Sequence, residues 1–141
     1  MLYLVLRLVL GGIFIYAGFL KAGDARSFAG TIAAYKILPY FLNVLVASIL
    51  PWWEILLGVL LVTGYRIRAA AASVALINIV FTIALAAAMA RGLDIDCGCF
   101  GNETTKTPLY ISLLRDIIFI GMAVMIYRLA ESRQSRRFIS M

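Results

Sequence analysis

Two cysteines separated by a single glycine, Cys97 and Cys99, are the residues best suited to chemistry in this sequence. Cysteines two positions apart can bring their Cα atoms within the disulfide range of about 4.4–6.8 Å, and Gly98 tolerates the backbone turn that this needs. So small a ring is strained, which favours the dithiol and makes the disulfide oxidising, whereas a structural disulfide gains most from closing a long loop. The spacing therefore favours a redox-active pair; soft-metal binding, as of Cu(I), and an inert role are the alternatives.

The composition excludes other chemistry and predicts a membrane protein. The 141 residues include no histidine, so His-ligated haem, His-ligated zinc and a histidine general base are impossible within this sequence. We therefore expect no haem and no zinc, and we assign no metal site. Hydrophobic residues make up 64% and charged residues 14%, with a mean hydropathy of +0.99, against roughly 45–50% and 25% in soluble domains. The net charge of +6 is then expected to meet a membrane surface and not nucleic acid.

Four apolar runs are each long enough to cross a bilayer as a helix, which takes about 20 residues. We predict an all-α, four-helix transmembrane bundle, a single domain over 1–141, with spans at 2–20, 40–63, 69–90 and 109–127. The loop 91–108, which carries the cysteines, joins the last two spans. The first run also resembles a signal peptide, but no A-x-A cleavage site follows it, so we expect a retained helix.

The segment between Lys21 and Pro39 has a different pattern. Charged residues are spaced among Phe28, Ile32 and Tyr35, which recur at helical intervals. This pattern is typical of a short helix lying in the membrane interface, with a solvated loop as the alternative.

The distribution of arginine and lysine predicts the sidedness of the bundle. Four crossings put both termini and the turn 64–68 on one face, and this face has the larger share of basic residues. The positive-inside rule then places both termini in the cytoplasm of a bacterial cell, with the chain in the cytoplasmic (inner) membrane. The cysteine loop faces outward, where thiols can be oxidised and remain so.

Charged side chains inside the predicted spans are Arg7, Glu54, Arg115 and Asp116. Each costs roughly 2.5–3.5 kcal/mol to insert, so such residues normally face the bundle interior and pair with one another. Helical rise puts Glu54 at an intermediate depth, within reach of either Arg7 or Arg115. The four residues are expected to form a buried charge network, which either fixes the helix register or serves as a proton or redox-ligand site.

Two tryptophans, Trp52 and Trp53, precede Glu54 in the middle of the second span and follow Pro51. Tryptophan usually concentrates at membrane interfaces, and a proline can kink a helix. A kink beside two indole rings and a carboxylate is a candidate pocket for a flat ring such as a membrane quinone. Trp52, Trp53, Glu54 and Arg115 are thus candidate quinone-binding residues, with plain aromatic packing as the alternative.

The chain resembles the MauE/DoxX family of small four-helix membrane proteins over nearly its whole length. The matching motifs include Ala17-Gly18-Phe19-Leu20-Lys21, Leu50-Pro51-Trp52-Trp53-Glu54, Cys97-Gly98-Cys99-Phe100-Gly101 and Arg115-Asp116. The resemblance implies a membrane helper of extracytoplasmic thiol–disulfide chemistry that acts with a thioredoxin-like partner or a disulfide-rich client. Quinone-coupled disulfide-forming enzymes have a similar helix plan but two cysteine pairs, whereas this chain has one.

These observations together predict a membrane thiol–disulfide oxidoreductase. Cys97 and Cys99 would exchange electrons between a thioredoxin-like extracytoplasmic protein, or client, and a membrane quinone. The alternative from another class is a non-catalytic assembly or docking subunit for a periplasmic redox protein, which should tolerate serine at both cysteines. A transporter would need a polar path through the membrane, which four mutually cancelling charges do not favour.

Overall fold

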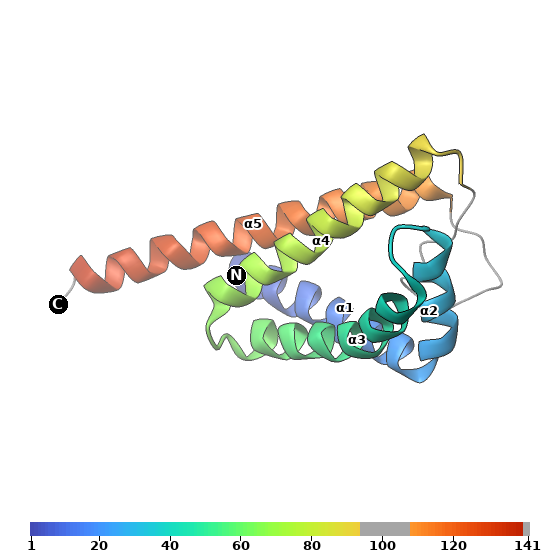
Figure 1. The fold of residues 1–141 in the computed structure, drawn as a ribbon. Helices are drawn as coiled ribbons and strands as arrows, with labels where there is room; N and C mark the ends of the chain where they lie inside the picture. The colour runs from blue at the N-terminus through green and yellow to red at the C-terminus, as the bar shows by residue number, and fades with distance from the viewer. Residues whose placement is uncertain (94–107, 140–141) are drawn as a thin grey trace.

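The computed structural model describes residues 1–93 and 108–139. It has helices α1 (Leu2–Gly23), α2 (Ala25–Ala34), α3 (Tyr40–Thr63), α4 (Ile67–Ala90) and α5 (Leu109–Ile139), as Figure 1 shows. No strand occurs in the described ranges, so the predicted all-α fold is confirmed. Helices α1, α3 and α4 and residues Tyr110–Ser135 of α5 are each long and apolar enough to cross a membrane.

The helices end where local chemistry stops them. The Asp24 carboxylate accepts a hydrogen bond of 3.1 Å from the backbone N–H of Ser27, which caps α2 and separates it from α1. Gly64 ends α3 in the left-handed conformation with φ of 82°. As the sequence predicts, Arg91 and Gly92 end α4, and Gly92 again has a positive φ.

Two element boundaries differ from the sequence-based expectation. Helix α5 continues to Ile139, well past the predicted end at 127, and projects beyond the other helices in Figure 1. The segment predicted between Lys21 and Pro39 contains a helix only over Ala25–Ala34. Lys21 itself belongs to the last turn of α1, and this assignment changes the buried charge network.

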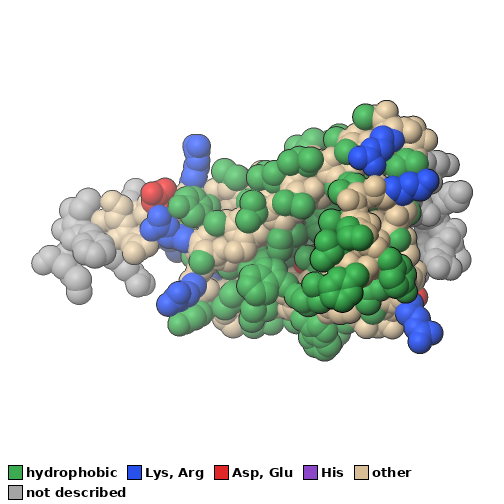
Figure 2. All heavy atoms as spheres, in the orientation of Figure 1, with side chains coloured by type: hydrophobic (Ala, Val, Ile, Leu, Met, Phe, Trp, Pro, Cys, Tyr) green, Lys and Arg blue, Asp and Glu red, His purple; other side chains and the backbone are tan. Residues whose placement is uncertain are grey.

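The bundle consists of two closely packed pairs, α1 with α3 and α4 with α5. Both termini and the α3–α4 turn lie at one end, whereas α2, the end of α4 and the start of α5 lie at the other (Figure 1). Buried side chains from four helices form the main core: Leu10, Phe14, Leu57, Leu61, Ala70, Ala71, Val74, Ala123 and Ile126. Hydrophobic side chains also cover much of the outer surface, with lysine and arginine toward the two ends (Figure 2).

Glycines fix the register of α1 against α3. A Cβ atom added at Gly11 would lie 2.8 Å from the Gly58 carbonyl oxygen, and one added at Gly18 would lie 2.8 Å from the Pro51 carbonyl oxygen. The backbones therefore approach too closely for any larger residue at these positions. Gly18 contacts Pro51 and Ile55, so the turn of α3 that contains Glu54 packs against Gly18 of α1.

Candidate functional site

The centre of the site is an ion pair between α1 and α3. The Lys21 Nζ atom donates hydrogen bonds of 2.7 and 2.8 Å to the two carboxylate oxygens of Glu54, and each residue is only 4% exposed. The ammonium also lies 5.3 Å from the ring centroid of Phe28 in α2 and 5.8 Å from that of Phe81 in α4. Four helices thus enclose one charged pair, with favourable cation–π contacts on Lys21.

The expectation that Glu54 pairs with Arg7 or Arg115 was wrong. Arg7 reaches Val62, which lies eight residues from Glu54, or about 12 Å along α3. Its Nε and Nη2 atoms instead donate to the carbonyl oxygens of Leu61 and Val62 at 2.9 and 3.0 Å. Arg7 therefore caps the carboxyl end of α3, where a positive charge is favourable.

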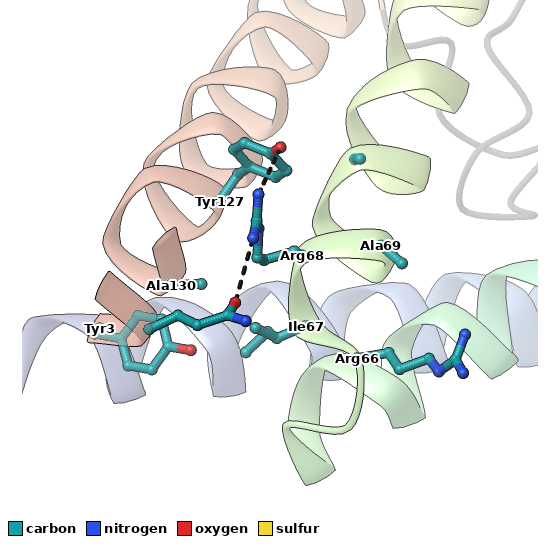
Figure 3. Close-up of a pocket in the computed structure, with 9 residues that line it drawn as sticks. Tyr3, Arg66, Ile67, Arg68, Ala69, Tyr127 and Ala130 are labelled. Carbon is teal, nitrogen blue, oxygen red and sulfur yellow. Dashed lines mark hydrogen bonds between the residues drawn. The ribbon is translucent and has the colours of Figure 1, made fainter. Parts of the chain in front are cut away.

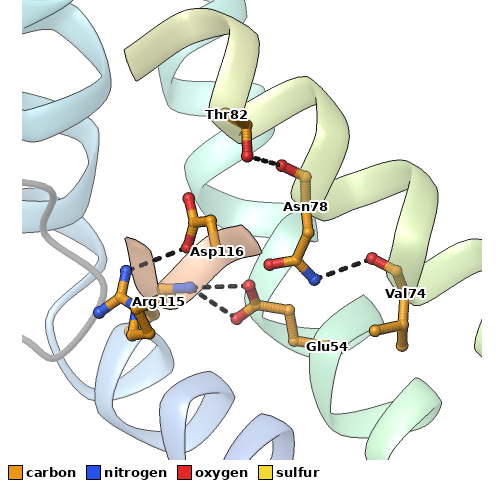
Figure 4. A network of polar contacts seen from close by, with 7 residues as sticks. Glu54, Val74, Asn78, Thr82, Arg115 and Asp116 are labelled. Atoms are coloured by element: carbon orange, nitrogen blue, oxygen red, sulfur yellow. Dashed lines mark hydrogen bonds and ion pairs between the residues drawn. The ribbon is translucent and has the colours of Figure 1, made fainter. Parts of the chain in front are cut away.

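Arg115 and Asp116 of α5 form a second pair beside the first. The Arg115 Nη2 atom lies 3.4 Å from the Asp116 Oδ1 atom, and Asp116 is 3% exposed. Figure 4 shows this pair, Glu54 and Asn78 of α4 pointing into one region between the helices. The Asn78 side chain donates to the Val74 carbonyl oxygen of its own helix at 2.8 Å.

These groups line a cavity of about 30 Å³ whose polar lining is Lys21, Glu54, Asn78, Arg115 and Asp116. The two acidic and two basic residues cancel in formal charge. Asp116 Oδ2 is buried with no hydrogen-bond partner in the described part of the chain. The space suits one or two water molecules, since each needs roughly 10–15 Å³, and is far below the roughly 300–1,000 Å³ of an organic ligand pocket. The arrangement can thus join the helices and hold water.

The four candidate quinone residues do not line one cavity. Trp52 and Trp53 are 66% and 47% exposed, whereas Glu54 is buried. Successive residues of a helix point about 100° apart, so the two indole rings face outward, where the apolar surface would meet lipid. Glu54 and Arg115 do share the cavity beside Lys21, but that cavity does not fit a quinone ring.

Cys97 and Cys99 lie outside the described residues, but the two ends of their loop are described. Leu93, three residues after the end of α4, packs with Leu113 against Tyr35 and Leu85. Arg91 donates a hydrogen bond of 3.4 Å to the Tyr35 carbonyl oxygen. The segment with the cysteines therefore leaves α4 at a packed anchor, at the end of the bundle where α2 lies (Figure 1).

Lys21 is the site residue that the sequence reasoning missed. Lys21 is absent from the predicted charge network, although helical spacing places it on one face of the first span with Gly11, Phe14 and Gly18. All four are buried in α1. A lysine at the end of a face that continues the glycine spacing was the available signal.

Comparison with known proteins identifies the family. The family model for methylamine utilisation protein MauE matches residues 1–129, a range that includes both cysteines. The methylamine utilization protein MauE of Paracoccus denitrificans is 34% identical over 123 residues, covering 86% of this chain and 66% of that protein. The protein of the same name from Methylophilus methylotrophus is 36% identical over 107 residues, covering 74% and 56%.

A third relative, MauE of Methylorubrum extorquens, is 30% identical over 111 residues, covering 78% of this chain and 58% of its own length. This chain thus spans between 56% and 66% of the length of these curated relatives. No solved structure matches the chain significantly. The family match over residues 1–129 confirms the resemblance found in the sequence, and the chain belongs to the MauE family of membrane proteins.

Proposed function

We propose that this chain is the membrane component of an extracytoplasmic thiol–disulfide exchange system, with Cys97 and Cys99 as the exchanging pair. The observation that carries the proposal is the anchoring of the cysteine segment. The residues that begin this segment, Arg91 and Leu93, contact Tyr35 at the end of α2. A bundle that holds the start of this segment is suited to presenting a short C-x-C sequence to a soluble partner.

The exchange is balanced between the chain and its partner. A partner thiolate attacks one sulfur of the Cys97–Cys99 disulfide, the S–S bond breaks, and a mixed disulfide forms while the other cysteine leaves as a thiolate. A second partner thiolate then attacks the mixed disulfide. Two electrons have moved to the chain, and the partner carries the new disulfide. A thioredoxin-like protein or a disulfide-rich client supplies the required dithiol.

Reoxidation of the dithiol needs a two-electron acceptor, and we propose a membrane quinone for this role. The cavity beside Glu54 and Arg115 is too small for it, so the quinone would have to reach the cysteines from the lipid. Trp52 and Trp53 are exposed on the outer surface of α3, where a quinone in the lipid could contact them.

The docking-subunit alternative is favoured by a specific observation as well. The buried charges of α1, α3 and α5 are paired and closed to organic ligands, which is what a purely structural bundle requires. Such a subunit would retain its function with serine at both cysteines.

A redox titration of the purified chain tests the proposal. The protein is equilibrated in detergent with glutathione mixtures of known potential, acid-quenched and alkylated, and its free thiols are counted by mass. We expect one two-electron transition, at a potential above the roughly −300 mV below which structural disulfides lie. Thiols that stay free in oxidised glutathione would contradict disulfide exchange. In a separate assay in cells, full activity of the Cys97→Ser/Cys99→Ser variant would establish the docking subunit instead.

A further inference from the structure

A cavity of about 620 Å³ opens at the end of the bundle opposite α2, between the start of α1, the start of α4 and the outer part of α5. Its lining includes Tyr3, Arg68, Tyr127 and Gln134. Figure 3 shows the Arg68 side chain reaching from α4 toward Tyr127 of α5, whereas Arg66 points away from it. Arg68 is therefore the basic group directed across this cavity.

Arg68 is held in place without being neutralised. Its Nη1 atom donates to Gln134 Oε1 at 3.2 Å, and its Nη2 atom donates to the Tyr127 hydroxyl at 3.4 Å. The nearest carboxylate, that of Glu131, lies 3.9 Å away, and both side chains of this pair are largely solvent-exposed. Such an exposed pair is weak, so the guanidinium can bind a better-placed anion.

An apolar groove continues from this cavity along the bundle. It has a volume of about 390 Å³ between α4 and α5, and Ala72 and Tyr127 line both spaces. The groove is lined further along by Ala75, Leu76, Ile79, Ala123 and Val124. Its floor of small side chains leaves room for a hydrocarbon chain that runs parallel to the helices.

The depth of the two spaces matches a lipid molecule. Helix α4 has 24 residues, or about 36 Å, against a hydrocarbon core of about 30 Å, so its first turn lies in the headgroup region. Arg68 is in that turn, and the groove runs from it toward the middle of the span. The two linings together carry Arg66, Arg68 and Arg128 against Glu131, so the local charge is positive.

We infer that the α4–α5 face binds an acidic glycerophospholipid, with its phosphate at Arg68 and Tyr127 and an acyl chain in the groove beyond Ala72. Basic pockets between transmembrane helices are the usual sites for anionic headgroups. The guanidinium supplies charge-assisted hydrogen bonds to phosphate oxygens, and the groove supplies apolar contact that free phosphate cannot use.

The test is lipid binding to the purified full chain in detergent, measured by native mass spectrometry. Phosphatidylglycerol and phosphatidylcholine with identical acyl chains are titrated separately. We expect one phosphatidylglycerol to bind in preference to phosphatidylcholine. Arg68→Gln should weaken the binding of phosphatidylglycerol about fivefold, as expected for loss of one basic residue near a membrane surface. It should weaken the binding of phosphatidylcholine less, because the choline cation offsets the charge of the phosphate. Arg68→Lys should restore most of the preference.

Ala72→Leu tests the groove separately, because this exposed residue lies where cavity and groove meet. This substitution should weaken the binding of both lipids, because the larger side chain blocks the groove that takes the acyl chain. Arg26→Gln and Ala86→Leu, exposed positions that line neither space, are the matched controls and should change nothing.

Three results would overturn the inference. The first is equal binding of the two lipids by the unchanged protein. The second is displacement of the lipid by millimolar inorganic phosphate, with lipid binding weakened by Arg68→Gln but not by Ala72→Leu. This result would identify a free-phosphate site. The third is a change of oligomeric state in Ala72→Leu with lipid binding intact, which would assign the groove to a partner helix. None of these results depends on the cysteines.

Discussion

The ammonium of Lys21 and the carboxylate of Glu54 meet in the interior of the bundle with N–O distances of 2.7 and 2.8 Å. Their Cα atoms are not level, because the turn of α3 that contains Glu54 packs against Gly18, three residues before Lys21. Side chains lean toward the amino end of their own helix, and α1 and α3 are antiparallel, so the two side chains lean toward each other. The pair joins the carboxyl end of α1 to the middle of α3.

Removing one member of this pair should be far more harmful than removing both. Glu54→Gln or Lys21→Met leaves an uncompensated buried charge, and we expect each to lower the free energy of unfolding by about 3–5 kcal/mol. Lys21→Met/Glu54→Gln should recover a large part of the loss. The measurement is unfolding in mixed detergent micelles, with the exposed Arg26→Gln as a neutral control.

The same experiment separates Lys21 from the partners that the sequence offered. Arg7 caps α3 about 12 Å from Glu54 along the helix, so Arg7→Gln and Glu54→Gln should have additive effects. Strong coupling of Glu54 to Arg7, with none to Lys21, would show that the pairing is wrong.

The glycine contacts between α1 and α3 predict opposite effects for two neighbouring substitutions. Gly11→Ala places a Cβ atom 2.8 Å from the Gly58 carbonyl oxygen, whereas Gly12→Ala meets no atom within 4 Å. We expect Gly11→Ala to destabilise by about 1–3 kcal/mol through overpacking. Gly12→Ala should be neutral or stabilising by up to about 1 kcal/mol, since alanine favours a helix. Equal effects in thermal unfolding would argue against the close approach.

Sidedness gives a third prediction. The basic residues of the end that carries both termini predict a cytoplasmic location for that end and an extracytoplasmic location for the cysteine loop. In intact cells, a membrane-impermeant thiol reagent applied after mild reduction should therefore modify Cys97 or Cys99. The Cys97→Ser/Cys99→Ser variant is the background control, and modification only after lysis would reverse the topology.

The quinone half of the proposed function can be tested without a partner protein. Reduced protein in detergent is mixed with a soluble quinone, and free thiols are counted over time. We expect loss of two thiols per chain with formation of quinol, and no loss in the double serine variant. Thiol counts that stay constant while the quinone stays oxidised would exclude a quinone as the direct acceptor.

Much of the fold could be predicted from the sequence because a bilayer imposes a simple length rule. Apolar runs of about 20 residues identified the long helices, and Gly92 and Gly64 lie where α4 and α3 end. The tail after Tyr127 was harder, because its polar residues give no span signal and yet continue α5. The helical spacing of Gly11 and Gly18 puts both on one face of α1, and this is the face that contacts α3.

The partners within the buried network were not predictable to the same degree. Helical rise gave approximate depths, but Arg7 and Lys21 lie on one face of α1, and the packing register of α1 against α3 decides which of them meets Glu54. That register depends on backbone contacts at Gly11, Gly18 and Gly58. The direction of Trp52 and Trp53 follows from the same register, since Glu54 faces inward and its two predecessors then face outward.

The central claim is that Cys97 and Cys99 exchange disulfides with a soluble partner, and trapping the mixed disulfide tests it most directly. Cys97→Ser and Cys99→Ser are expressed separately in cells, which are acid-quenched and analysed on non-reducing gels. We predict that the variant lacking the resolving cysteine accumulates a covalent complex with a thioredoxin-like protein or client. Reductant should cleave this complex, and the double serine variant should not form it. Absence of any such complex in both single variants, with normal activity in cells, would contradict the claim.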